Sequence, residues 1–159
     1  MFNAYDPVQV AWKIVDTARR MGIYLTHMQL QKLVYIAHGF SLAGLHRPLI
    51  AEPVTAWKYG PVIPRVYQAF KEYGGSVIPQ PINTPCFSHD VEQLIQSVVS
   101  SYGRLSGVQL SELTHQVGTP WYNVWVHESG HLTDNAVIPD HAIKAHYEKL
   151  LCGQCTHSL

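Results

Sequence analysis

The sequence predicts a mainly α-helical fold: a compact single-domain bundle of about seven short helices with a minor extended segment near residues 54–57. Apolar residues recur at helical spacing along most of the chain, whereas Val54-Thr55-Ala56-Trp57 is a β-prone stretch that follows Pro48 and Pro53. The chain has 159 residues, of which 47% are hydrophobic and 14% are charged, enough for one domain to bury a core without disulfides or a metal. We therefore expect one domain over residues 1–151 and a flexible C-terminal tail over residues 152–159.

Start and stop signals mark two helices in the first part of the chain. The first helix is expected to begin after Asp6-Pro7, an N-cap followed by a proline at the first helical position, and to stop at Gly22. The second is expected to begin where Thr26 and Gln29 can form a capping box, and to end near Gly44.

The middle of the chain predicts two more helices, separated by a loop. A short helix opens near Pro64 and closes at Gly74-Gly75, and a proline-containing surface loop then covers residues 75–88. Ser88 is the expected cap of the next helix, which carries a wide apolar stripe and ends at Gly103.

Three further helices are expected in the last third. Ser106 and Gln109 form a second potential capping box, and Thr119-Pro120 opens a short helix soon afterwards. The final helix follows Pro139 and is expected to end at Leu151.

Composition excludes several classes of partner and compartment. The 11 basic side chains balance the 11 acidic ones, so the chain has no overall attraction for nucleic acid or anionic lipid. No apolar run reaches the roughly 18–20 residues that a membrane span requires, and the first residues lack the pattern of a secretory signal. The 3 cysteines do not form an even disulfide framework, which fits a reducing compartment, so we expect a cytoplasmic protein.

Three ordered sequence blocks carry a family resemblance. They are Leu30-Gln31-Lys32-Leu33-Val34-Tyr35, then Ala56-Trp57-Lys58-Tyr59-Gly60-Pro61-Val62, then Leu113-Thr114-His115 followed by Pro120-Trp121. Together they resemble the Panacea domain family, which includes the SocA-like antitoxins and the phage-associated GepA-like proteins. The resemblance implies a mostly helical antitoxin that neutralises a cognate toxin by direct contact and, in some members, delivers that toxin to an ATP-dependent protease.

The resemblance implies no catalytic residue and no cofactor. The positions that match the family motif are Gln31, Lys32, Tyr35, Trp57, Tyr59, Gly60, Pro61, His115, Pro120 and Trp121. Among them, Lys32, Trp57, Tyr59 and Pro61 are the candidates for partner binding, because aromatic side chains dominate protein interfaces. For Trp57 and Tyr59 the alternative is packing in the interior, and for Lys32 it is a structural role at the edge of a buried helix face, snorkelling or paired with a carboxylate or a carbonyl.

The aromatic Gly-Pro block itself, residues 56–62, is expected to make little regular backbone hydrogen bonding, because glycine and proline interrupt helices and strands. We interpret it as a rigid corner whose side chains are kept for their shape.

Chemistry-bearing side chains give no convincing catalytic or metal site. The 10 histidines lack the paired spacing of a helical zinc motif, and Cys152-x-x-Cys155-x-His157 is at most half of a site. A helix-turn-helix-like segment at residues 106–128 raises the alternative of a DNA-binding transcriptional regulator. Residues 105–143 contain no Lys or Arg, however, so a phosphate-binding surface is not expected there. The sequence does not determine an oligomeric state.

Overall fold

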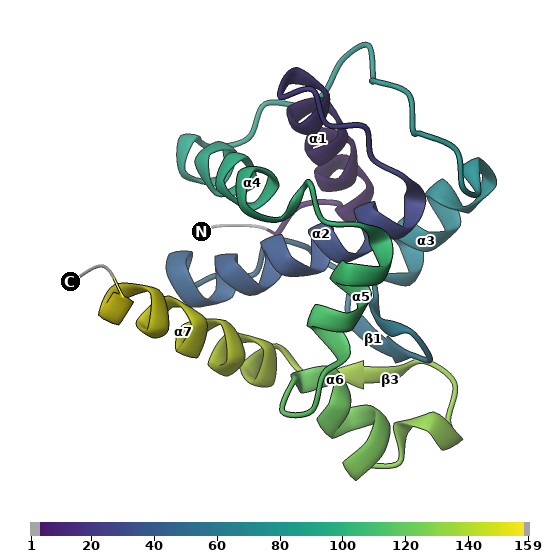
Figure 1. Cartoon of the computed structure of the whole chain (residues 1–159), viewed down its shortest axis with the longest axis vertical. Helices are drawn as coiled ribbons and strands as arrows, with labels where there is room; N and C mark the ends of the chain where they lie inside the picture. The colour runs from purple at the N-terminus through teal and green to yellow at the C-terminus, as the bar shows by residue number, and fades with distance from the viewer. Residues whose placement is uncertain (1–3, 158–159) are drawn as a thin grey trace.

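A computed structural model of the chain describes residues 4–157, and describes side chains as far as residue 153 (Figure 1). The elements are, in chain order, α1 (Pro7–Arg20), α2 (His27–Phe40), the π-helical turn η1 (Ser41–Leu45), β1 (Val54–Trp57), β2 (Gly60–Val62), α3 (Pro64–Phe70), the 3-10 turn η2 (Lys71–Tyr73), α4 (His89–Tyr102), α5 (Gly107–His115), α6 (Pro120–Tyr122), the π-helical turn η3 (Asn123–His127), the 3-10 turn η4 (Gly130–Leu132), β3 (Ala136–Ile138) and α7 (Asp140–His157). The mainly α fold that the sequence predicts is confirmed.

Helix α2 lies at the centre of the molecule. Helices α1 and α4 pack on one side of it and α7 runs along the other, while α5 crosses near its start (Figure 1). All of α2 is buried except Met28 and Gln29, which fits a helix that is enclosed on every side. Four buried residues of this helix, His27, Gln31, Lys32 and His38, are polar and need partners inside the protein.

A small antiparallel sheet covers one end of α2. Its strand order is β2-β1-β3, so the predicted extended segment is its central strand. The strand β3 comes from the far end of the sequence and pairs Val54 with Ile138 and Ala56 with Ala136. The sheet therefore joins the two halves of the chain.

Local capping signals are realised as predicted. The side chain of Asp6 accepts a backbone hydrogen bond at the start of α1. The capping box of Thr26 and Gln29 forms before α2, with Thr26 N donating to Gln29 Oε1 at 2.9 Å. That of Ser106 and Gln109 forms before α5, with Gln109 N donating to Ser106 Oγ at 3.1 Å.

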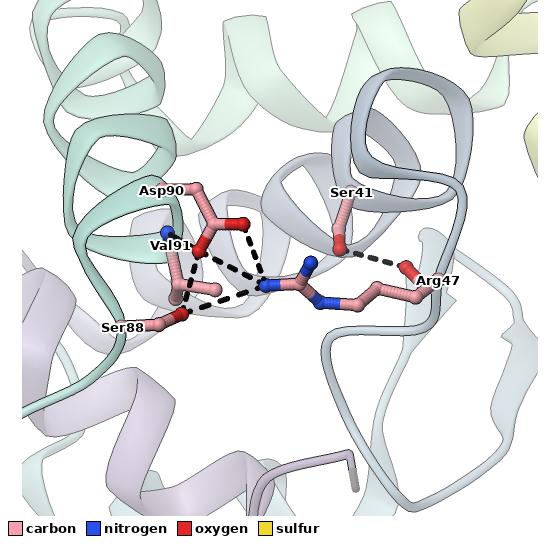
Figure 2. A network of polar contacts seen from close by, with 5 residues as sticks. All are labelled: Ser41, Arg47, Ser88, Asp90 and Val91. Atoms are coloured by element: carbon pink, nitrogen blue, oxygen red, sulfur yellow. Dashed lines mark hydrogen bonds and ion pairs between the residues drawn. The ribbon is translucent and has the colours of Figure 1, made fainter. Parts of the chain in front are cut away.

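The start of α4 is held by a polar network instead of a simple serine cap (Figure 2). Ser88 occupies the N-cap position, but its hydroxyl donates to Asp90 Oδ1 at 2.6 Å, and that carboxylate accepts from Val91 N at 2.8 Å. Arg47 Nη2 donates to both carboxylate oxygens at 2.9 and 3.0 Å, and Ser41 Oγ donates to the Arg47 carbonyl at 2.7 Å. The hydrogen bond from Ser88, and next those from Arg47, lower the pKa of the Asp90 carboxyl. The network fastens the segment after η1 to α4.

Helix α7 packs closely on α2 through one aromatic ring. The side chain of Tyr147 lies directly over Gly39, where a β-carbon would overlap the ring, and meets the ring of Phe40 edge-on at a centroid distance of 4.7 Å. A glycine is therefore required at this crossing because only its bare backbone leaves room for the tyrosine.

The final helix is longer than the sequence suggested. It runs to His157, so the predicted end at Leu151 is wrong, whereas the predicted division of the chain at residue 152 stays a prediction. Residues 158–159 of the expected tail lie outside the described residues. Within residues 4–157, no helix combines the length and the apolar character needed to cross a membrane.

Candidate functional site

The aromatic Gly-Pro block forms a β-hairpin. Strands β1 and β2 pair Ala56 with Pro61 and Trp57 with Gly60, and Lys58 and Tyr59 make the turn between them. The expectation that this block lacks regular backbone hydrogen bonding is therefore wrong. Pro61 is tolerated because β2 is an edge strand, where the missing N–H of proline leaves no ladder bond unmade.

Side chains from three helices hold this hairpin by its carbonyl groups. The donors are Trp121 Nε1 of α6 to Trp57 O at 2.6 Å, Ser111 Oγ of α5 to Tyr59 O at 2.5 Å, and Lys32 Nζ of α2 to Pro61 O at 3.0 Å. We call Lys32, Ser111 and Trp121 the anchoring side chains. Their acceptors are the carbonyls of every second residue along the hairpin, at positions 57, 59 and 61. The three bonds therefore fix the position and tilt of the hairpin relative to the helices.

Lys32 is the most unusual of the anchoring side chains. The residue is only 4% exposed, and burial lowers the pKa of its ammonium from 10.5 to about 8. Of the two roles considered from the sequence for a structural Lys32, it adopts bonding to a carbonyl rather than snorkelling. Gly60 lies against it, with a φ of +123° and a Lys32 Nζ that would stand 3.1 Å from an added β-carbon. Gly60 is thus needed both for its backbone conformation and for the space that Lys32 fills.

Gln31 and Tyr35 occupy the same helix but do not join the hairpin. Gln31 Nε2 lies 3.3 Å from His27 Nδ1, one turn earlier in α2. The Tyr35 ring packs edge-on against Tyr147 of α7 at 6.0 Å between centroids, and burial raises the pKa of its hydroxyl. Among the described residues, the Tyr35 hydroxyl and Gln31 Oε1 have no hydrogen-bond partner. The two motif positions therefore serve the interior of the helix bundle.

Two other motif positions support the anchor Trp121. Pro120 is the first residue of α6, whose N-cap Thr119 accepts a hydrogen bond from a backbone N–H of that helix. His115, at the end of α5, lies edge-on to the Trp121 ring at 5.3 Å between centroids, and its Nδ1 contacts the carbonyl of Ser111. The structure thus brings the motif residues His115, Pro120 and Trp121 together beside the hairpin.

The turn of the hairpin is presented to solvent. Tyr59 is 64% exposed, and the Lys58 ammonium lies 5.4 Å from the centroid of its ring. Trp57 is half-buried, with its ring edge-on to Tyr67 of α3 and its Nε1 donating to Asn135 Oδ1 at 2.8 Å. Of the candidate binding residues, Tyr59 has an exposed side chain, whereas Lys32 and Pro61 are buried.

Sequence reasoning missed two residues of this site, Ser111 and Asn135. Neither belongs to a recognisable motif, and both contact the hairpin only because distant segments fold against it. The only sequence signal for Ser111 was its place in the helix that carries Thr114 and His115. Ser111 lies one helical turn before Thr114 and His115, so it faces the same side of the helix as these motif residues. It could therefore have been considered as a contact with the hairpin block.

The titratable side chains in the described part of the chain do not gather into a metal centre. The search for three or more His, Cys, Asp or Glu side chains placed for a metal finds none within it. His38 and Asp140 form a pair at 2.9 Å, but His38 Nδ1 accepts from Leu49 N, so both ring nitrogens are engaged in structure. The side chains of Cys155 and His157, two of the three residues of the cysteine-histidine motif considered above, lie outside the described residues.

The segment proposed as a helix-turn-helix belongs to the hairpin support. Its second helix is α6, whose Trp121 is buried and anchors the hairpin, followed directly by the π-helical η3. Residues 106–128 also contain no Lys or Arg that could contact phosphates.

This geometry defines a class of protein: a helical module in which side chains of three helices hold one exposed hairpin. Residues 30–122 match the family described as "Antitoxin SocA-like, Panacea domain", a stretch that spans α2 to α6 and contains all three anchoring side chains. Antitoxin SocA of Caulobacter vibrioides (strain NA1000 / CB15N) is 34% identical over 131 residues, which cover 75% of this chain and 70% of that protein. No solved structure matches the chain. The chain belongs to the SocA-like Panacea domain family.

Proposed function

We propose that this protein is an antitoxin that neutralises a cognate toxin stoichiometrically by binding it with the hairpin face. The hairpin face is the turn residues Lys58 and Tyr59 together with the exposed side chains of Met28 and Val108. Membership of the SocA-like family supports the antitoxin role. The single observation that supports this location is the convergence of three helices on the carbonyls of one exposed hairpin.

The exposed side chains of the hairpin face come from segments that contact one another. Ser111, which holds Tyr59, lies three residues after Val108 on α5, so the two share one side of that helix. Gly107 packs against Met28, with an added β-carbon standing 3.0 Å from Met28 Cβ. Tyr59, Val108 and Met28 are 64%, 65% and 50% exposed. Exposed aromatic and aliphatic groups on one face are typical of protein-binding sites.

Rigidity is what makes the hairpin suited to tight binding. A loop that is already fixed in its bound shape loses little conformational entropy when a partner binds, so more of the contact energy appears as affinity. Tyr59 has few rotatable bonds and a large contact area, and is therefore the expected anchor of the interface. Blocking a working surface of the toxin in this way needs no cofactor.

Delivery of the bound toxin to an ATP-dependent protease is a second step that the family resemblance suggests. We expect both blocking and delivery to take place in the cytoplasm. Comparing the half-life of the toxin in cells with and without the protease would test delivery. A toxin that is equally stable in both strains would leave blocking as the mechanism.

The proposal is tested by co-expression with each neighbouring gene product. One product should arrest growth alone, be harmless with the wild-type chain and co-purify with it. Tyr59→Ala should weaken this binding by about 30-fold, the loss typical of an interface hot spot. Tyr24→Ala is the matched control, because Tyr24 is 60% exposed but lies outside the hairpin face. If no neighbouring product binds, or if both variants lose binding equally, the proposal is wrong.

A further inference from the structure

A second surface feature lies on the side of the hairpin that faces β3. It is an open hollow of about 390 Å³, which we call the aromatic hollow. Its main lining residues are Trp57, Lys58, Trp125, His131, Asp134 and Asn135. None of the sequence motifs predicted it, because its walls come from the hairpin and from the segment before β3, about 70 residues apart in the chain.

The walls of the aromatic hollow are held in place without a ligand. Trp57 Nε1 donates to Asn135 Oδ1 at 2.8 Å, which fixes one indole. The other indole, Trp125, stacks on the anchor Trp121 with a centroid distance of 5.7 Å and an interplanar angle of 16°. His131 Nδ1 lies 2.7 Å from the Trp125 carbonyl. Two half-buried indoles thus form a preorganised aromatic site.

The polar groups of the aromatic hollow favour a donor-rich, positively charged ligand. Asp134 is exposed and supplies a carboxylate. Because the Trp125 carbonyl can only accept, His131 Nδ1 carries its proton, and in the neutral ring Nε2 is an acceptor. The one lysine of the lining, Lys58, places its ammonium 5.4 Å from the centroid of the Tyr59 ring on the hairpin face.

Charge complementarity extends beyond the aromatic hollow. The sequence between residues 105 and 143 contains no Lys or Arg but contains Glu112, Glu128, Asp134 and Asp140. This segment builds α5, α6 and most of the hollow, and its carboxylates attract a partner of positive charge. A nucleic acid could stack its bases on the indoles, but its phosphates would be repelled.

We propose that the aromatic hollow binds an arginine side chain on the surface of the toxin, with the guanidinium against an indole and paired with the Asp134 carboxylate. The inference rests on the proposed function, to which it adds the chemistry of the partner. A guanidinium fits better than an ammonium because it is planar, stacks on aromatic faces and pairs with a carboxylate through two hydrogen bonds. Tyr59 and the aromatic hollow would then bind the toxin on two sides of one rigid hairpin.

The experiment titrates the full chain with a capped tetra-arginine peptide and follows the indole N–H signals of its tryptophans by NMR. The signals of Trp57 and Trp125 should shift with the peptide, and tetraglutamate should not move them. Asp134→Asn should weaken peptide binding by about tenfold, as expected for loss of a charge-assisted pair. Glu112→Gln is the control, because it removes the same charge from the same acidic segment outside the hollow.

Two results of the peptide titration would overturn the inference. One is an equal loss of affinity in Asp134→Asn and Glu112→Gln, which would mean that only the general negative field attracts the peptide. The other is a shift of the same signals by a single-stranded oligonucleotide and not by the peptide. The toxin separates this inference from the proposed function: an unaltered toxin affinity in Asp134→Asn overturns the arginine site alone, whereas absence of any binding toxin overturns the proposed function.

Discussion

Replacing Lys32 by methionine should make the stability of the protein less dependent on alkaline pH, because methionine keeps the length of the side chain and removes its charge. In the folded protein burial lowers the pKa of the ammonium from 10.5 to about 8. Between these two values the unfolded chain binds more protons than the folded one, so the free energy of unfolding rises with pH. At neutral pH the buried ammonium lowers the free energy of unfolding by about 3 kcal/mol, because each pKa unit between the two values corresponds to about 1.4 kcal/mol.

The measurable part lies between about pH 7.5 and pH 9.5, where Lys32 should add about 2 kcal/mol to the free energy of unfolding as the pH rises. Above about pH 10 the buried Tyr35 and Tyr147 act in the opposite direction, because burial raises the pKa of both hydroxyls. Lys32→Met should show none of the 2 kcal/mol rise. At neutral pH the variant lacks the hydrogen bond to Pro61 O, which lowers its stability by about 1–3 kcal/mol. It also lacks the desolvation penalty of the buried ammonium, which is of similar size and acts in the opposite direction.

Urea unfolding followed by circular dichroism at both pH values measures the effect, with the exposed Lys71→Met as the control. The difference in unfolding free energy between wild type and Lys32→Met should change by about 2 kcal/mol across the window, and that between wild type and Lys71→Met should stay constant. Parallel pH profiles of wild type and Lys32→Met would refute the claim that the ammonium is desolvated in the folded protein.

Two further predictions concern α2. Gly39→Ala should lower the free energy of unfolding by about 2–3 kcal/mol in urea titrations, since its β-carbon overlaps the Tyr147 ring. Gly44→Ala is its control, with only an ordinary 3.8 Å contact to accommodate, and equal losses in both would contradict the role of the α2–α7 crossing. In an NMR titration the His27 imidazole should have a pKa below 6.5, chiefly because of burial and also because of Lys32. The unfolded chain then binds more protons than the folded one, so the free energy of unfolding decreases as the pH falls. Lys32→Met should move the His27 pKa upward, and an unmoved value would contradict the coupling.

Local signals let the sequence predict most of the helical framework. The capping boxes at Thr26 and Ser106 depend on residues three positions apart, and both form as expected. The end of the last helix was placed too early, because the residues after Leu151 contain no proline and only one glycine to stop it. Helix ends without a clear stop signal are set by packing that a sequence does not display.

The hairpin was misread because its determinants are not local. Pro61 and Gly60 argue against a strand when read alone, and become compatible with one only at a sheet edge beside Lys32. The strand that completes the sheet begins at Ala136, far along the chain from β1. Helical periodicity placed Lys32 at the edge of a buried face, but the depth of burial depends on the hairpin that covers it.

Hydrogen exchange of the protein with and without its toxin tests the central claim most directly, because it locates the contact surface without a substitution. Binding should slow exchange in the hairpin at residues 54–62 and in α5, and leave the backbone amides of α1 and α4 unchanged. Protection confined to α1 and α4, with the hairpin exchanging as fast as in the protein alone, would contradict the account.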